Sequence, residues 1–337
     1  MTVNAVLSQL VQRNDLSQKE SRELVTFLTQ QATPSQIAGL LTALASKGEE
    51  VEEIVGFIKG MREKVTTVAV PKGSIDVCGT GGDGKHTFNI STAAAFVLAG
   101  GGVSVAKHGN RAASSNCGSA DVLEALGVRI TLTSSQAETV LKKVGLVFLF
   151  APVFHQSFKE VGMVRKELGI RTIFNYIGPF ASPAGVERQV IGVPSKAIAL
   201  RLAAVAQQLS YAHVCIITSE DGMDEASIFT KTQVYEIKGR KIREYVIDPN
   251  AYGFTKAQIT DIQGADAQTN AAIIEAILSG KKGPQLDIVL LNSALGFVVA
   301  GKVTTIEEGI TLAKESIDTG AALQVLHNLR KETQKYA

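Results

Sequence analysis

A glycine-rich stretch beginning at Gly73 has the composition of a phosphate-binding loop. Residues 73–92 read GSIDVCGTGGDGKHTFNIST, and the apolar residues 75–78 predict a buried strand. Four of the next six residues are glycines, namely Gly79, Gly81, Gly82 and Gly84. Residues without a Cβ can adopt left-handed conformations and bring backbone N–H groups close to a bound anion. The stretch therefore predicts a loop that holds phosphate.

A helix is predicted immediately after this loop. Asn89, Ser91 and Thr92 carry short polar side chains and precede the run AAAFVLA, which favours a helix. Ser91 or Thr92 is the expected N-cap, because a hydroxyl oxygen can accept a hydrogen bond from a free backbone N–H of the first turn. The start of the helix would offer an anion further N–H groups and the positive end of a dipole.

The spacing Gly79-x-Gly81-x-x-Gly84 also satisfies the dinucleotide-binding fingerprint. In that motif the helix begins within the glycines, and an acidic residue about 20 positions further on binds the ribose. Here the helix is expected near residue 91, and the next strand, residues 102–106, leads into Lys107 instead of an acid. An ordinary turn needs fewer glycines than this loop has. A phosphate site explains the pattern better than either alternative.

A second polar segment follows the strand predicted at residues 102–106. Residues 107–115 read KHGNRAASS, and NCGS then leads into another helix. Lys107 can place a positive charge beside a phosphate, and the serine and asparagine side chains can hydrogen-bond it. A basic loop with serines is by itself more often a solvated surface. Two such loops after adjacent strands of a parallel sheet point to one shared ligand site.

Composition is that of a soluble globular protein. The 337 residues are 45% hydrophobic and 20% charged, with a formal net charge of +2. So small a charge gives no basis for binding nucleic acid or a membrane surface. Cys78, Cys117 and Cys215 lie far apart and are expected to be reduced thiols of a cytoplasmic protein. We expect neither a signal peptide nor a membrane span, because no apolar run approaches about 18 residues.

The predicted elements form a small all-helical domain, residues 1–67, and a larger α/β domain, residues 68–337. Amphipathic helices are expected from residue 3, after Ser17, after Thr33 and from residue 51. Further on, strands alternate with helices, which predicts a mainly parallel sheet covered by helices. The segment 155–185 is expected to pack at the hinge with the helical domain. The expected strands are residues 75–78, 102–106, 128–132, 146–150, 189–193, 212–218 and 285–291, with a hairpin at 233–247.

Four segments resemble the anthranilate phosphoribosyltransferase family of tryptophan biosynthesis. They are GTGGDGKHTFNIST, KHGNRAASSNCGSADVLEALG, VRKELGIRTIFNYIGP and DGMDEAS, and the similarity extends over nearly the whole chain. The resemblance implies a nucleoside phosphorylase/phosphoribosyltransferase-like fold and a homodimer formed through the helical domain. It implies transfer of a phosphoribosyl group from 5-phosphoribosyl 1-diphosphate (PRPP) to the amino group of anthranilate. Pyrophosphate would be released, with Mg²⁺ as cofactor, two ions per subunit, and with neither nucleic acid nor membrane as a partner.

The resemblance also assigns roles to residues. Arg165, Gly79 and Asn110 would line the anthranilate site, where a guanidinium suits a carboxylate. Ser91, Asp224 and Glu225 would bind magnesium, which prefers hard oxygen ligands and shares them with substrate phosphates. No residue is assigned to covalent or acid–base catalysis. Donor binding is implied for Gly79, Gly82, Asp83, Thr87, Asn89, Ile90, Ser91, Thr92, Lys107, His108, Gly109, Asn110, Arg111, Ala112, Ala113, Ser114, Ser115 and Ser119.

The chain departs from the family pattern near the expected acceptor site. Gln156, Ser157 and Phe158 stand where the family has Pro-Ala-Met, and Ser182 replaces an asparagine. Two other functions share some of these features. A pyrimidine nucleoside phosphorylase has the same architecture and a glycine-rich phosphate loop, but acts on nucleosides. A non-catalytic relative that binds nucleic acid would show salt-dependent binding, against which the near-neutral charge argues.

Overall fold

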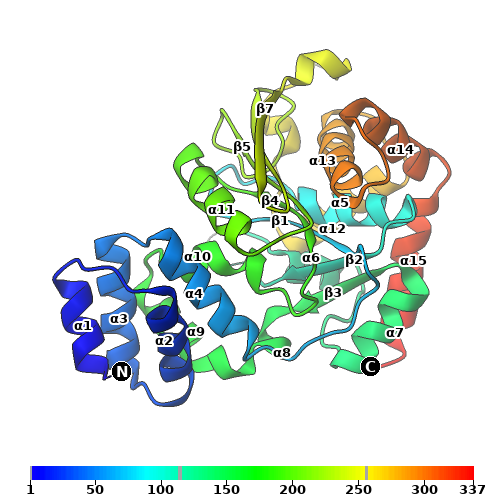
Figure 1. Ribbon diagram of the computed structural model, residues 1–337. Coiled ribbons are helices and arrows are strands. Elements are labelled where there is room, and N and C mark those ends of the chain that lie inside the picture. Colours follow the sequence, from blue (N-terminus) through cyan, green and yellow to red (C-terminus); the bar gives the residue numbers. More distant parts are fainter. Residues whose placement is uncertain (1, 113–115, 255–256) are drawn as a thin grey trace. The chain divides into compact units, whose positions relative to one another are not determined.

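Two units make up residues 2–112, 116–254 and 257–337, the part of the chain described by a computed structural model (Figure 1). The first unit comprises Met1–Thr67 and Pro152–Gly185, and the second comprises Val68–Ala151 and Val186–Ala337. The first unit is therefore built from two separate stretches of sequence. The second unit contains both predicted phosphate loops.

Helices are the regular elements of the first unit within the described residues. Ser17 and Thr33 each begin a helix through a capping box, in which the hydroxyl oxygen accepts an N–H from the third helical residue. Both helix starts were predicted from these residues and are confirmed. The helices are α1 (Val3–Val11), α2 (Gln18–Gln30), α3 (Pro34–Lys47), α4 (Val51–Arg62), α8 (Ala151–Phe154), η1 (Gln156–Phe158), α9 (Lys159–Leu168), α10 (Phe174–Ile177) and η2 (Pro179–Ala181).

Close packing of α2 on α4 stabilises the first unit. Gly56 permits this approach, because a Cβ at that position would lie 2.4 Å from the backbone oxygen of Gln18. Near the start of α4, the fully buried carboxylate of Glu53 pairs with Lys47 at 2.9 Å and accepts the N–H of Leu16 at 2.9 Å. A buried carboxylate is tolerated only when it is paired and hydrogen-bonded in this way.

A sheet in the order β3-β2-β1-β4-β5-β6-β7 forms the centre of the second unit (Figure 1). The first five strands of that order run parallel, and β6 and β7 are antiparallel to their neighbours. The predicted mainly parallel sheet and the predicted hairpin are therefore confirmed. The strands are β1 (Ile75–Gly79), β2 (Val105–Gly109), β3 (Leu146–Phe150), β4 (Arg188–Gly192), β5 (His213–Ser219), β6 (Thr232–Lys238) and β7 (Lys241–Ile247).

Helices cover both faces of this sheet, as expected for a parallel sheet whose strands are apolar runs. One face is covered by α11, which packs on β5 and β6, while α5 and α13 pack together against β1 on the other. The helices of the second unit are α5 (Ile90–Gly100), α6 (Ser119–Ala125), α7 (Ser134–Val144), α11 (Lys196–Gln208), η3 (Pro249–Tyr252), η4 (Ile259–Ile262), α12 (Ala267–Leu278), α13 (Pro284–Ala300), α14 (Ile306–Asp318) and α15 (Ala321–Gln334).

Two of the predicted strands are wrong. Residues 285–291 belong to α13, which is buried among the sheet, α5 and α14, so its apolar residues show no helical periodicity. Pro284 at its first position and Gly301 after its end, with φ of 75°, mark it as a helix. Residues 128–132 bury alternate side chains as a strand does, but they form no ladder with the sheet. Extended chain packed on the core produces the same apolar alternation.

The second strand is displaced from its predicted position. Gly102, with φ of 79°, still belongs to the turn after α5, and β2 begins at Val105. Lys107, His108 and Gly109 are consequently the last residues of β2 rather than the start of the following loop.

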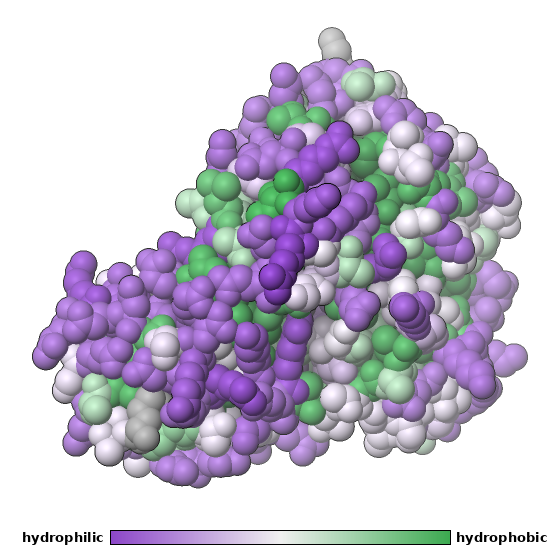
Figure 2. All heavy atoms as spheres, in the orientation of Figure 1, coloured by the Kyte–Doolittle hydropathy of each residue, from purple (hydrophilic) through white to green (hydrophobic). Residues whose placement is uncertain are grey.

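Hydrophilic residues cover most of the face shown in Figure 2, and the hydrophobic residues on it form separate patches. The large hydrophobic side chains that are exposed among the described residues are Val11, Met163, Ile170, Leu200, Ile242 and Val246. Within the described part of the chain, no helix has the length and apolar content needed to cross a bilayer.

Candidate phosphate and metal site

The order of the strands places a crevice at the end of β1. The chain leaves β1 for β2 and β3 on one side and returns to β4 on the other side, so the connections diverge at β1. Open α/β sheets bind ligands at such a switch point, outside the carboxyl ends of the strands. The last residues of β1 and β4, Gly79 and Gly192, are register partners at this point.

Both of these glycines make room for Asp224, which lies in the loop between β5 and β6. A Cβ at Gly79 would lie 2.3 Å from Asp224 Oδ2, and a Cβ at Gly192 would lie 1.6 Å from the Asp224 backbone oxygen. The loop that carries the predicted metal ligands therefore lies directly over the ends of the two central strands. Gly192 was missed by the sequence analysis, although its place directly after the apolar pair Val190 and Ile191 is the available signal.

The glycine loop adopts conformations that favour glycine. Gly81, Gly82 and Gly84 have φ of 74°, 78° and 70°. At Gly81 the loop contacts the acidic segment, because its N–H donates to Asp224 Oδ2 at 2.6 Å. Thr87, further along, forms an isolated bridge with Gln263 and is thereby held to the chain that follows η4. The loop thus has fixed attachments at both of its ends.

The predicted N-cap of the following helix is wrong. Helix α5 begins at Ile90, and Asn89 occupies the N-cap position without making a side-chain cap hydrogen bond. The Asn89 amide instead donates to the Cys117 backbone oxygen and accepts from Asn270, both at 3.0 Å. Ser91 and Thr92 consequently lie in the first turn of α5. A helix start presents its first N–H groups to an anion, and here the Ser91 N–H bonds the Glu225 carboxylate.

Lys107 reaches the start of α5 from β2. Its side chain is buried, and its ammonium donates to the Val77 backbone oxygen at 2.6 Å and to Ser91 Oγ at 3.2 Å. Among the described residues, no carboxylate forms an ion pair with it. The structure therefore places a positive charge directly behind the hydroxyl of Ser91.

Three carboxylates converge from the glycine loop and the loop after β5. Burial, and then the charge of Asp83, raise the pKa of Asp224 above its ordinary value. Burial, and then the charge of Asp224, raise the pKa of Glu225 in the same direction. Asp83 Oδ2 is a buried oxygen without a hydrogen-bond partner among the described residues. Hard oxygen ligands that repel one another fit a divalent cation such as magnesium, whose charge would offset the repulsion.

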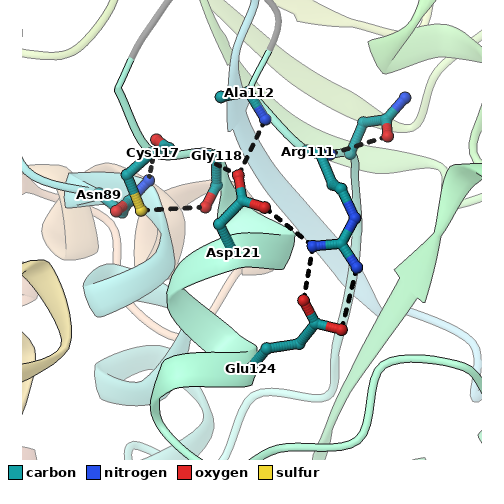
Figure 3. A network of polar contacts seen from close by, with 8 residues as sticks. Asn89, Arg111, Ala112, Cys117, Gly118, Asp121 and Glu124 are labelled. Carbon is teal, nitrogen blue, oxygen red and sulfur yellow. Dashed lines mark hydrogen bonds and ion pairs between the residues drawn. The ribbon is translucent and has the colours of Figure 1, made fainter. Parts of the chain in front are cut away.

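The loop after β2 is tied to the helix that follows it (Figure 3). Arg111 donates to Asp121 Oδ1 at 2.9 Å and also bonds Glu124, while the N–H groups of Ala112 and Gly118 donate to Asp121 Oδ2 at 3.0 and 2.9 Å. The guanidinium of Arg111 is thus already paired with acids of α6. Ala113, Ser114 and Ser115 lie outside the described residues.

The remaining predicted donor residues surround this loop. His108 and Gly109 end β2, and a Cβ at Gly109 would lie 2.8 Å from the Phe148 ring. Asn110 is exposed and accepts the N–H of Arg111 through its side chain at 2.8 Å. Ser119 is the first residue of α6.

Arg165, the predicted anthranilate ligand, belongs to the first unit and lies on α9. Its guanidinium stacks over the ring of Phe174 at 4.9 Å. Burial lowers the pKa of Arg165, and no carboxylate of the described residues pairs with it. An arginine held in place by an aromatic ring, without an acidic partner, is suited to binding a carboxylate.

A second set of metal-binding residue types lies on β5 and β6, where His213, Cys215 and Glu236 are buried within 4.8 Å of one another. These groups are already paired, since Glu236 bonds His213 at 2.8 Å and Lys238 at 2.9 Å. Burial raises the pKa of the Cys215 thiol and keeps it neutral. This cluster therefore has a structural explanation that requires no ion.

Comparison with known proteins covers both parts of the chain. A model of the glycosyl transferase family, helical bundle domain, matches residues 4–65, and one of the glycosyl transferase family, a/b domain, matches residues 72–323. The anthranilate phosphoribosyltransferase of Desulforamulus reducens is 47% identical over 98% of this chain and 97% of its own length.

Two solved structures show the same fold. The structure of anthranilate phosphoribosyltransferase from Thermus thermophilus superposes with a TM-score of 0.91 at 38% identity, covering 98% of this chain and 99% of the other. The enzyme from Saccharomyces cerevisiae in complex with PRPP and Mg gives 0.91 at 29% identity, covering 99% of this chain and 98% of that one.

Proposed function

This chain belongs to the anthranilate phosphoribosyltransferases of the glycosyl transferase family, and on that premise we propose how its residues carry out the reaction. The enzyme transfers the phosphoribosyl group of PRPP to the amino group of anthranilate, giving N-(5-phosphoribosyl)anthranilate and pyrophosphate in tryptophan biosynthesis. The observation that carries the proposed residue roles is the convergence of the glycine loop, Lys107 and the acidic pair at the switch point of the sheet.

PRPP would bind with its diphosphate at the glycine loop and the start of α5. Gly79 ends β1, Gly82 and Asp83 belong to the loop, and Ser91 and Thr92 lie in the first turn of α5, where the Ser91 N–H bonds the Glu225 side chain. Main-chain N–H groups and a helix dipole bind phosphate without a conformational change in the protein. The loop after β2, residues 107–115 with Ser119, would continue the donor site.

Magnesium would be held by Ser91, Asp224 and Glu225, with two ions per subunit. The raised pKa values of the two acids support this, because like charges buried together are stabilised by a cation. The chemistry that magnesium supplies in such a site is neutralisation of the diphosphate charge as pyrophosphate departs. The complex of the yeast enzyme with PRPP and Mg supports the use of magnesium together with this donor.

Anthranilate would bind with its carboxylate on Arg165, and with Gly79 and Asn110 lining the site. The absence of an acidic partner for the Arg165 guanidinium among the described residues supports this role. Two parallel N–H donors of a guanidinium match the two oxygens of a carboxylate. The acceptor amine would thereby be held in one orientation.

The reaction then needs positioning rather than a covalent catalyst. The bond from the ribose carbon to the pyrophosphate oxygen breaks, the amine nitrogen bonds to that carbon, and the amine proton passes to the released pyrophosphate or to water. Positive charge develops on the ribosyl carbon and negative charge on the leaving group. The N–H groups of the glycine loop and α5, together with Lys107, would stabilise the departing pyrophosphate, while Arg165 keeps the amine in line.

The assembly we propose is a homodimer of a cytoplasmic enzyme, formed through the helices of residues 1–67. A groove between α1 and α3, lined in part by Leu7, Leu10 and the exposed Val11, offers an apolar face for a second copy. Cys78, Cys117 and Cys215 form no disulfide with one another, which is compatible with a reducing compartment. Sedimentation of Val11→Asp against the unmodified protein tests the dimer.

A fluorescence assay of anthranilate consumption tests the proposed roles. Consumption should require both PRPP and magnesium, and it should fall in Asp224→Asn while the folded state is retained. If Asp224→Asn consumes anthranilate at the same rate as the unmodified protein, with the same half-saturating magnesium concentration, the assigned metal site is contradicted. Turnover of thymidine or uridine with phosphate would favour a nucleoside phosphorylase.

A further inference from the structure

Asn270 is a buried amide of the second unit that none of the roles above uses. It lies on α12, which packs on both α5 and α6, and only 1% of the residue is exposed. Its Oδ1 accepts the backbone N–H of Ala265 at 2.8 Å, and its Nδ2 donates to Asn89 Oδ1 at 3.0 Å. The Asn270 side chain also interacts with the thiol of Cys117. It therefore lies between the starts of the two helices that follow the glycine loop and the loop after β2.

The backbone fixes the direction of this amide. Because the Ala265 N–H is a donor, the Asn270 atom that bonds it must be the oxygen, and the Asn270 nitrogen then faces Asn89. The Asn89 oxygen accepts that hydrogen bond, which leaves the Asn89 nitrogen to donate to the Cys117 backbone oxygen at 3.0 Å. Asn270, Asn89 and Cys117 thus form a chain of hydrogen bonds with a single direction, which we call the amide relay.

The segment before α12 anchors one end of the amide relay to the glycine loop. The Gly264 N–H donates to the His86 oxygen at 2.8 Å, and the Phe88 N–H donates to the Ile262 oxygen at 3.1 Å. A Cβ at Gly264 would lie 2.8 Å from the Phe88 Cα, so the glycine permits this close approach. The chain that holds Asn270 is therefore fixed to the residues directly before Asn89.

The start of α6 anchors the other end of the amide relay, where Figure 3 shows the Asn89 side chain pointing at the Cys117 oxygen. The N–H of Gly118, the next residue, donates to Asp121 Oδ2 at 2.9 Å, and the Ala112 N–H donates to the same oxygen at 3.0 Å. A Cβ at Gly118 would lie 2.3 Å from the Ala112 nitrogen. A displacement of Cys117 would therefore be transmitted to both sides of the loop after β2.

We propose that Asn270 is a positioning residue for PRPP, which joins the glycine loop to the loop after β2 through the amide relay and so holds the two loops at one separation. The inference rests on the proposed donor site, because PRPP would contact both loops at once. Asn270 itself touches no substrate in this scheme. Loops that are already ordered bind a ligand more tightly, since no binding free energy is spent on bringing them together.

The variant Asn270→Ala removes the amide relay and leaves every proposed donor ligand in the chain. We expect the KM for PRPP to rise roughly tenfold, with kcat within about threefold, because part of the binding free energy must then order the two loops. Ser316→Ala is the matched control. It removes a buried hydrogen bond of the same unit, from Ser316 on α14 to the Val97 oxygen at 2.8 Å, about two turns along α5 from Asn89.

Ser316→Ala should lower the thermal midpoint and leave the KM for PRPP unchanged. If Asn270→Ala changes only the thermal midpoint, as the control does, then Asn270 is merely structural and the inference is wrong. Calorimetric titration with PRPP and magnesium separates this inference from the donor site on which it rests. Failure of the unmodified protein to bind would overturn the donor site itself, whereas equal affinity of the unmodified protein and Asn270→Ala would overturn only the role of Asn270.

A double-mutant cycle with Asn89→Ala tests whether Asn270 acts through Asn89. We expect Asn270→Ala to add little to the KM for PRPP of Asn89→Ala, because the amide relay is already broken there. Fully additive effects on this KM would refute the coupling. If Asn270→Ala does not fold, Asn270→Ser replaces it with the same expected results, because its smaller polar side chain leaves room for a water molecule at the Ala265 N–H.

Discussion

The substitution Gly79→Ala tests whether the end of β1 and the acidic loop form one site. The added Cβ would lie 2.3 Å from Asp224 Oδ2, whereas ordinary contacts begin at 3.4 Å, so the carboxylate must move by about 1 Å. That displacement breaks the hydrogen bond of 2.6 Å from the Gly81 N–H. Hydrogen bonds to charged groups contribute about 1.5–3 kcal/mol. We therefore expect the half-saturating magnesium concentration to rise roughly 10- to 150-fold.

The assay is a magnesium titration of the initial rate at saturating PRPP and anthranilate, followed by the loss of anthranilate fluorescence. Gly162→Ala is the control, because Gly162 is exposed on α9 and a Cβ there meets no atom within 4 Å. An alanine inside a helix should stabilise this control slightly and leave its metal dependence unchanged. A folded Gly79→Ala protein with the unmodified magnesium requirement would refute the proposed contact between the two loops.

Three further variants test the other parts of the account. Arg165→Ala should raise the KM for anthranilate roughly 10- to 100-fold and leave that for PRPP unchanged, and an unchanged anthranilate KM would remove its assigned role. Asp224→Asn with Glu225→Gln should greatly raise the magnesium requirement of the rate, and a normal titration would contradict the site. Burial lowers the pKa of His155 from 6.5 to about 4. The unfolded state then binds more protons, so acidification through this range should reduce the free energy of unfolding by up to about 3 kcal/mol. His155→Phe should flatten that dependence in urea titrations, and an unaltered pH profile would count against it.

Helices, strands and loops that are marked by a few neighbouring residues could be predicted from the sequence. The capping boxes at Ser17 and Thr33 marked helix starts, and β3 has the bounds that were expected for it. Gly81 and Gly84 marked a loop with left-handed backbone conformations, and Gly79 marked a close approach of the chain, while their phosphate role stays a prediction. Such features depend on a few neighbouring residues and are therefore visible in the sequence.

Features that depend on distant partners were not predictable. The apolar run within α13 lost its periodicity because neighbours from the whole second unit bury it, and it was mistaken for a strand. Asn89 became the N-cap of α5 while its side chain bonds Cys117 and Asn270, which no local pattern indicates. Gly192 must be a glycine because the Asp224 backbone occupies the position of a Cβ. Asp224 lies 32 residues later in the chain, so no local sequence pattern indicates this contact.

Calorimetric titration of PRPP into the unmodified protein, with and without magnesium, tests the central claim most directly. The glycine loop, Lys107, Asp224 and Glu225 should bind PRPP together with magnesium, so saturable binding is expected when the metal is present and a large loss of affinity when a chelator removes it. Absence of binding heat with magnesium, or equal affinity with and without the metal, would contradict the account.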